Sequence, residues 1–414
     1  MSFSALHSKP ILLSYLLFFC SCNICLCKEI RVGMSAAFSG PTRGLGIELF
    51  RGSMAYFSHI NEEGGVFGNK IKIIAYDDGY NPIPTVRNTI RLVEDDDVFL
   101  LLDYVGTPTV TRVLPLVKKY GDQHHTFLFF PFTGAQPQRE YPYSQYVFNL
   151  RASYRQEIYA IVNYLLSIGS NRFAVFYQID AYGRSGWEGV QSALEKHGLT
   201  VVGEATYYRG AKYEQSMKEQ VRILAAGSPD AIVSIGTSEA CAAFIRDARD
   251  GGMNIPIANV SFVDSESQLS LLLRTSKAKG RDYTNNLINS QVVPSYEETN
   301  LPAVTEYRIL MEKYNVPPPA NLVGADYQPR RFSPVSLEGF LNAKLLVEIL
   351  KMIGPNPQRT NIKNVVENIR DFDIGINAPI SFGADKHQGL DVVFLNMVES
   401  GRFVTLTDWK GSEK

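Results

Sequence analysis

The sequence predicts an α/β protein with two doubly wound, mostly parallel sheets, each of which forms its own lobe. Three observations support this fold class. Short apolar strands alternate with helices of about 12 to 20 residues, the order that builds βαβ units. The alternation stops and restarts near Arg151, so it forms two successive runs. No low-complexity linker separates the runs, and short direct crossings should therefore join the lobes.

The first run starts with residues 29–35, in which every second side chain is apolar, as expected of a strand. The next segment has apolar residues at helical spacing and stops at Gly64 and Gly65, where a glycine cap fits. Residues 98–102 are apolar on both faces, which indicates a strand covered by helices on either side. The other elements predicted in this run are a strand at 70–76, a helix from Pro82 to about Asp96, a helix from about Thr107 to Tyr120 and a strand at 126–130.

The second run repeats this order beyond Arg151. It contains predicted helices at 153–168, 183–197, 213–226 and 237–250 and predicted strands at 172–177, 199–207, 230–235 and 256–262. The final part of the chain is less regular. Prolines 317–319 and Pro329 indicate an extended surface stretch before a long helix from Val335 to Ile353. Short strand patterns follow at 380–382, 392–397 and 402–406.

Composition excludes several classes of protein. The 414 residues are 45% apolar and 20% charged, the mixture of a globular chain rather than a disordered one. Lys and Arg number 41 against 42 Asp and Glu, a net charge of −1. Because no basic stretch attracts phosphates, nucleic acid is not expected as a partner. No apolar run after residue 27 is long enough to span a membrane.

The first 27 residues have the pattern of a secretory signal. The apolar run Ile11–Phe19 is too short to cross a bilayer, and a cysteine-rich stretch follows it. Cys25 and Cys27 place small side chains where a signal peptidase needs them, just before Lys28. We therefore expect residues 1–27 to be removed on export.

A lipid anchor at Cys22 is the alternative, although the residues before Cys22 fit a lipoprotein signal poorly. Four of the five cysteines lie in this leader, so their spacing carries no redox or metal chemistry. The mature chain keeps only Cys241 and has no disulfide, so burial of its core must stabilise it.

Motifs of enzymes are missing or incomplete. No phosphate-binding loop of the Gly-x4-Gly-Lys type occurs. Gly44 and Gly46 follow the first strand, but Leu49 stands where a dinucleotide-binding turn needs its third glycine. The pair His124–His125 lies on a short loop where its side chains point apart, and a solvated loop explains it better than a metal site. We therefore expect no enzymatic activity, no cofactor and no metal.

Several stretches taken together resemble a known family. Val32–Pro41, Ile60–Ile71 and Tyr76–Pro82 are similar to the opening of type I periplasmic solute-binding proteins, above all the Leu/Ile/Val-binding proteins of ABC importers. Further similar stretches follow in the family's order at 132–135, 178–183, 236–238 and 337–348. The resemblance implies a three-crossing hinge between the lobes and a small ligand in the cleft. On this basis residues 28–150 and 289–388 form lobe 1, and residues 151–288 and 389–414 form lobe 2.

Candidate ligand-binding residues in lobe 1 follow its strands. Gly106 and Thr107 come after the buried strand at 98–102, where the N–H groups and dipole of a starting helix suit a carboxylate. Thr133 and Gly134 follow the next strand and offer a hydroxyl and a further N–H. Ordinary capping is the alternative for both pairs, since Thr and Gly are common at such turns. The resemblance adds Leu45 as a wall of the side-chain pocket.

In lobe 2 the resemblance points to Tyr182 as the aromatic that closes over the ligand and to Thr237 as a contact after a strand. Tyr154, just after the first crossing, is a further candidate. Packing over the core is the alternative for Tyr182, as for many aromatic residues near turns.

One departure from the family concerns charge. Amino-acid binders of this family place an acid in the second lobe to pair with the ligand's ammonium group. In this chain the corresponding stretch, residues 259–264, has Ser261 or Phe262 near that position, and Asp264 comes two or three residues late. Asp264 or Glu338 are candidate substitutes. Otherwise the ligand is not an α-amino acid, and amides, urea-like compounds and aromatic acids become candidates, because an unpaired ammonium in a closed cleft is costly.

The sequence therefore predicts an exported receptor, located in the periplasm, that captures a small polar or amphipathic molecule. It would deliver this ligand to an ABC-type permease in the inner membrane. The alternative output is signalling to a sensor kinase or another receptor, since type I folds serve both roles.

Overall fold

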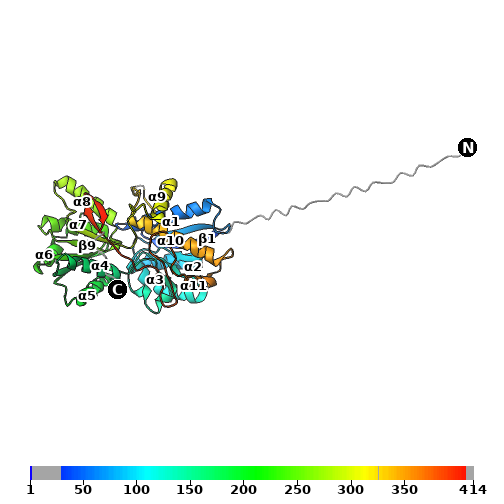
Figure 1. The fold of residues 1–414 in the computed structure, drawn as a ribbon, viewed down its shortest axis with the longest axis horizontal. Helices are drawn as coiled ribbons and strands as arrows, with labels where there is room; N and C mark the ends of the chain where they lie inside the picture. Colours follow the sequence, from blue (N-terminus) through cyan, green and yellow to red (C-terminus); the bar gives the residue numbers. More distant parts are fainter. Residues whose placement is uncertain (2–28, 325, 407–414) are drawn as a thin grey trace.

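The computed structural model describes Met1 and residues 29–324 and 326–406, which form two lobes lying side by side (Figure 1). Each lobe is built on its own sheet, and the predicted fold class is confirmed. The predicted signal peptide, residues 1–27, falls almost entirely outside the described residues. Among the described residues, no helix combines the length and apolar character needed to cross a bilayer.

The first lobe contains a five-stranded sheet of order β2-β1-β3-β4-β5. Every pairing in it is parallel. Its strands are β1 (Glu29–Ala36), β2 (Lys70–Asp77), β3 (Leu100–Leu102), β4 (Leu128–Phe129) and β5 (Val147–Phe148). Its helices are α1 (Arg43–Glu62), α2 (Pro82–Glu94), α3 (Thr107–His124), α9 (Pro302–Tyr314), α10 (Pro334–Ile353) and α11 (Arg359–Val366).

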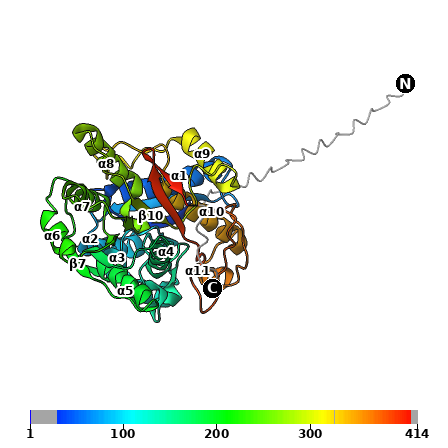
Figure 2. The ribbon, with the colours of Figure 1, turned by 60° about the vertical axis from the view of Figure 1, so that its left-hand side comes forward.

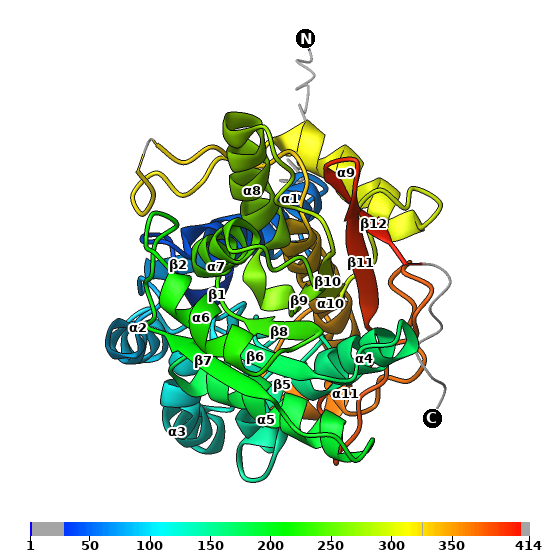
Figure 3. The same cartoon turned by 90° about the vertical axis from the view of Figure 1, so that its left-hand side faces the viewer.

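The second lobe contains a seven-stranded sheet of order β12-β11-β10-β9-β8-β6-β7, which faces the viewer in Figure 3. Its strands are β6 (Phe173–Gln178), β7 (Gly203–Tyr207), β8 (Ala231–Ile235), β9 (Ile257–Asn259), β10 (Leu287–Gln291), β11 (Phe394–Glu399) and β12 (Arg402–Thr405). Only the last two strands pair in the antiparallel sense. The helices are α4 (Tyr154–Ser167), α5 (Ala181–Glu195), α6 (Lys218–Ala226), α7 (Ser238–Asp250) and α8 (Ser265–Lys279).

Helices cover the sheets in groups, as a doubly wound fold requires. In the first lobe α1, α9, α10 and α11 pack together, while α2 packs with α3; in the second lobe α4 packs with α5, and α6 and α8 pack with α7. The approach of α1 to α10 is especially close, because Gly339 has no side chain there. A Cβ atom at Gly339 would lie 2.2 Å from the carbonyl oxygen of Leu49. The long α10 is buried over most of its surface and forms the centre of the first lobe's core.

The chain passes between the lobes in a bundle of extended segments. Asn149, on the first crossing, forms a parallel bridge with Gln388 on the last crossing. The N–H of Gly389 donates to the carbonyl of Asn149 over 2.8 Å, so these two crossings run side by side. Strand β10 pairs with β9 over Leu287–Asn289 and with β11 over Ile288–Gln291. The chain therefore leaves the second sheet after Gln291, rather than between residues 288 and 289 as the resemblance implied.

Figure 2 shows β11 close to β10, although residues that build the first lobe separate these strands in the sequence. The predicted strands at 392–397 and 402–406 correspond to β11 and β12. The predicted strand at 380–382 is wrong. Ile380 makes only an isolated bridge with Phe372, while Ser381 and Phe382 donate to Gly389 and Ile369, so the three residues have no common partner strand.

Candidate functional site

Aromatic rings fill the contact between the two lobes. Phe262 of the second lobe is central, with its ring centroid 5.8 Å from that of Tyr80 and 5.7 Å from that of Phe132, both from the first lobe. Tyr182 lies 4.7 Å from Phe262 and 5.4 Å from Tyr154. All five side chains are buried. We call these five residues the aromatic cluster; it marks the place where the lobes close on each other.

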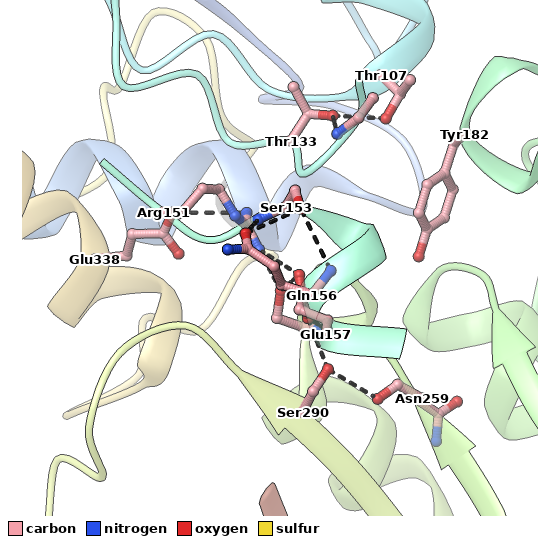
Figure 4. A network of polar contacts seen from close by, with 12 residues as sticks. Thr107, Thr133, Arg151, Ser153, Gln156, Glu157, Tyr182, Asn259, Ser290 and Glu338 are labelled. Carbon is pink, nitrogen blue, oxygen red and sulfur yellow. Dashed lines mark hydrogen bonds and ion pairs between the residues drawn. The ribbon is translucent and has the colours of Figure 1, made fainter. Parts of the chain in front are cut away.

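The start of α3 lies beside this cluster. Gly106 precedes the helix with φ +104°, a conformation that favours glycine, and a Cβ atom there would lie 2.2 Å from the Tyr80 ring. No side chain caps α3. The hydroxyls of Thr107 and Thr133 share a hydrogen bond of 2.6 Å (Figure 4). These two turns therefore lie next to each other, with the positive end of a helix dipole behind them.

Tyr154 brings a third hydroxyl to this point. Its N–H donates to the carbonyl of Gly134 over 2.7 Å, and its ring lies against Gly134. Burial raises the pKa of Tyr154, and the nearby hydroxyls of Thr133 and Thr107 oppose that rise. Within the described residues the Tyr154 hydroxyl is buried and makes no hydrogen bond of good geometry. A buried hydroxyl of this kind is costly unless a ligand or water satisfies it.

The other residues that the resemblance implies have contacts of their own. Tyr182 donates a hydrogen bond of 3.3 Å to the carbonyl of Gly236, just before Thr237. Thr237 precedes α7, and its N–H donates to the Tyr207 hydroxyl over 2.9 Å. Leu45 is buried in the first turn of α1. Thr237 therefore follows the residue that binds Tyr182, and neither Thr237 nor Leu45 belongs to the aromatic cluster.

A buried charge cluster occupies the hinge next to the aromatic rings. The Arg151 guanidinium lies 3.6 Å from Glu157 of α4 and 3.6 Å from Glu338 of α10, and it stacks 4.5 Å from the Phe132 centroid. Arg151 also donates to the Ser261 hydroxyl. Figure 4 shows Arg151 between the two carboxylates, so this cation joins an acid of one lobe to an acid of the other.

Glu157 is the most fully hydrogen-bonded member of the charge cluster. Its carboxylate accepts from the N–H and hydroxyl of Ser261, at 2.8 and 3.0 Å, and from the Ser290 hydroxyl at 2.6 Å. Ser261, a candidate ligand contact in the sequence, is thus engaged by Glu157 and Arg151. For Glu338, burial raises the pKa to about 7, and Arg151 opposes that rise.

Asp264 lies elsewhere, at the start of α8. It has φ +57°, and its carboxylate accepts a hydrogen bond of 3.3 Å from the N–H of Ser267, which caps the helix. Neither substitute for the family's acid is therefore a free carboxylate inside the aromatic cluster. Glu338 is paired with Arg151, and Asp264 is used as a cap.

Sequence reasoning brought together Thr107, Thr133, Tyr154 and Tyr182, and the structure places them around one buried region. It missed Tyr80, Phe132, Arg151 and Glu157 as members of the site. A partial signal was present, because Tyr80 and Phe132 both lie in stretches that resemble the family. For Arg151 and Glu157 the sequence offered no comparable signal. No group of three or more His, Cys, Asp or Glu side chains suited to a metal occurs among residues 29–324 and 326–406.

Comparisons with known proteins agree with this architecture. The family model described as periplasmic binding protein matches residues 29–402. The Leu/Ile/Val-binding protein of Escherichia coli (strain K12) is 24% identical over 268 residues, which cover 63% of this chain and 70% of that protein.

Two solved structures illustrate the similarity in three dimensions. A possible leucine/isoleucine/valine-binding protein from Rhodopirellula baltica SH 1 has a TM-score of 0.81 and 30% identity, over 92% of this chain and 97% of that one. A fatty acid ABC transporter substrate-binding protein from Thermomonospora curvata has a TM-score of 0.76 and 22% identity, over 93% of both chains, which shows the shared fold alone. With a family model that matches nearly all of the described chain, this protein belongs to the periplasmic binding protein family of solute-binding proteins.

Proposed function

We propose that this protein captures a small carboxylate-bearing molecule between its lobes and delivers it to an ABC-type permease in the inner membrane. The observation that carries the proposal is the buried Tyr154 hydroxyl, which among the described residues makes no hydrogen bond of good geometry. It lies beside Thr107 and Thr133 at the start of α3, whose N-cap, Gly106, has no capping side chain. A carboxylate there would accept hydrogen bonds from hydroxyls and helix N–H groups and would lie at the positive end of the helix dipole.

The ligand should lack an ammonium group. Four acids near the interface already have partners: Glu157 and Glu338 share Arg151, Asp264 caps α8, and Asp180 caps α5. Ser261 or Phe262 stands near the position at which the family places its acid, and the Phe262 ring belongs to the aromatic cluster. An ammonium enclosed against this ring would lose its water without gaining a counter-charge. The fold itself is compatible with carboxylates that lack an ammonium group, because the Thermomonospora curvata neighbour is described as a fatty acid ABC transporter substrate-binding protein.

The proposal also covers where the protein is located and which membrane partner recognises it. The leader pattern of residues 1–27 supports export to the periplasm, and the family supports a role in transport. Signalling to a sensor kinase is the second candidate output, since the same closed lobes could be recognised by either partner.

A matched pair of ligands tests the proposed ligand class. L-leucine and 4-methylpentanoate share a carbon skeleton and a carboxylate and differ in the ammonium group. Calorimetry on the exported protein should show 4-methylpentanoate binding at least tenfold more tightly. L-leucine, L-isoleucine and L-valine should bind with dissociation constants weaker than about 1 mM, or about −4 kcal/mol.

Micromolar binding of L-leucine would contradict the ligand class while supporting capture. A thermal-shift screen that adds benzoate, phenylacetate, acetamide and urea covers the other candidates, because saturation at a hundred times the dissociation constant stabilises by about 2.7 kcal/mol. If no compound in the screen shifts the melting temperature, capture of a small carboxylate is contradicted.

A further inference from the structure

The lobes also meet at a polar contact outside the aromatic cluster. On the second lobe, Asp264 caps α8, and the Ser267 hydroxyl donates to the Asp264 carboxylate. On the first lobe, residues 326–333, which we call the strap, run beside them (Figure 3). Arg330 of the strap donates through Nη2 to the Ser267 hydroxyl over 2.8 Å. Arg330, Ser267 and Asp264 thus form a hydrogen-bonded chain from one lobe to the other.

The strap is fixed firmly to the first lobe. Glu48 of α1 accepts hydrogen bonds from the N–H of Arg330 at 3.0 Å and from the Tyr327 hydroxyl at 2.9 Å. Arg51 donates to the carbonyl of Arg330 over 2.7 Å and pairs with Glu48 over 2.7 Å, with both side chains at most 2% exposed. The backbone of Arg330 is therefore anchored to a helix, and its side chain is held pointing at the second lobe.

Asp264 has a second positive neighbour on the first lobe. Helix α1 has no acidic residue in its first turn, and the side chain of Thr42 does not cap it. A Cβ atom at Gly44, in that first turn, would lie 2.7 Å from Oδ2 of Asp264. The carboxylate thus lies on the positive end of the α1 dipole, where a negative charge is stabilised.

Both favourable contacts exist only while the lobes touch. Burial of the guanidinium alone would lower the pKa of Arg330. The attraction of Asp264 and other nearby acidic groups outweighs this effect, so the pKa of Arg330 is raised. When the lobes separate, the carboxylate loses a cation and a helix dipole in one step. The neighbouring Arg331 provides a contrast, because its exposed side chain pairs with Glu312 of its own lobe.

We propose that Arg330, acting through Ser267 on Asp264, is a positioning residue that holds the two lobes closed and so sets how long a captured ligand stays bound. The proposal rests on the proposed capture between moving lobes and adds the residue that latches them. It also accounts for Asp264 as an acid that serves lobe closure instead of pairing with an ammonium group.

Hydroxyl-radical footprinting with mass spectrometry tests the latch without a ligand, on the exported protein. Tyr80 and Phe262 become accessible when the lobes part, whereas Phe176 and Phe244 stay buried inside the second lobe. The Arg330→Gln variant should raise the oxidation rate of Tyr80 and Phe262 about fivefold, the effect of losing a partly exposed charged hydrogen bond. Oxidation of Phe176 and Phe244 should not change, and the matched control Arg331→Gln should behave as the wild type.

Two further variants separate latching from plain structural support. Gly44→Ala adds a methyl group against Asp264 and improves helix propensity, so cleft oxidation should rise while the melting temperature stays equal or increases. Asp264→Asn keeps a capping side chain but removes the charge, and combining it with Arg330→Gln should raise oxidation no further than either single change.

Equal cleft oxidation in Arg330→Gln and Arg331→Gln would overturn the proposal. A parallel rise in the oxidation of Phe176 and Phe244 would also overturn the proposal, because Arg330 would then merely support the fold. These results do not depend on which ligand is bound. The latch and the proposed capture of a carboxylate can therefore fail separately.

Discussion

Arg151 is a single guanidinium that two carboxylates share, one from each lobe, and its Nε and Nη1 atoms make no hydrogen bonds within the described residues. Glu157 accepts three further hydrogen bonds, whereas among residues 29–324 and 326–406 the Glu338 carboxylate has only its ion pair with Arg151. Burial raises the pKa of Glu338 to about 7, which gives the hinge a titratable group close to neutral pH.

Glu338→Gln should change how stability depends on pH. The pKa of Glu338 is raised from its ordinary 4.5 to about 7 by burial, so the folded protein binds its proton more tightly than the unfolded chain does. The wild type should therefore lose stability relative to Glu338→Gln as pH rises from about 4.5 to about 7, by about 1–3 kcal/mol.

Chemical denaturation of both proteins between pH 4 and pH 8 measures this difference. Glu348→Gln is the control, because Glu348 lies on the same helix and pairs with Lys351 near the surface. Parallel stability curves for the wild type and Glu338→Gln would show that Glu338 does not titrate in this range.

At the scale of the element, strongly periodic segments could be predicted and polar ones could not. The strands at 29–35 and 70–76 and the long helix from Val335 to Ile353 were predicted from apolar spacing, and each is confirmed. Strand β10 was missed because its buried residues include Asn289, Ser290 and Gln291. Their polarity hides a central strand, since the partners that satisfy them, such as Glu157 for Ser290, come from distant parts of the chain.

Helix α8 was missed for a related reason. Its sequence mixes polar and apolar residues with little separation into faces, and its N-cap, Asp264, was interpreted as a ligand partner. The candidate site shows the same contrast between residues that could be predicted from the sequence and residues that could not. Turn residues such as Thr107 and Thr133 follow predicted strands, whereas Arg151 meets Glu338 of α10 only in the folded protein, because the two residues lie far apart in the sequence.

The close approach of α1 and α10 leads to a prediction for one glycine. In Gly339→Ala the new methyl carbon would lie 2.2 Å from a backbone carbonyl that cannot turn aside, so the helices must move apart. The unfolding free energy should fall by about 1–3 kcal/mol. Gly203→Ala is the control, since the nearest atom to its added carbon is 3.5 Å away. Urea denaturation compares the two, and equal stability would mean that the helix contact adapts freely.

At the scale of the whole molecule, the contacts between the lobes include the aromatic cluster, the Arg151 cluster and the Arg330 latch. The first depends on water exclusion, and the other two depend on charge. Two of the hinge crossings are hydrogen-bonded to each other, so the lobes should move as rigid bodies about this pair of segments.

Small-angle scattering should detect that motion. Adding 4-methylpentanoate at saturation should reduce the radius of gyration, because a captured carboxylate favours the closed lobes. The circular dichroism spectrum should stay unchanged, since each lobe keeps its internal structure. If calorimetry shows binding and the radius of gyration does not change, the lobes are closed before the ligand arrives.

The threading of the chain through the hinge also constrains how the protein is made. Helix α1 emerges early in synthesis, but α10, which packs on it, follows only after the whole central run of the second lobe. The second lobe in turn waits for β11 and β12 to complete its sheet. Neither lobe can therefore finish folding before the last stretch of the chain appears. These contacts between distant residues predict slow folding that becomes cooperative only once the polypeptide is nearly complete.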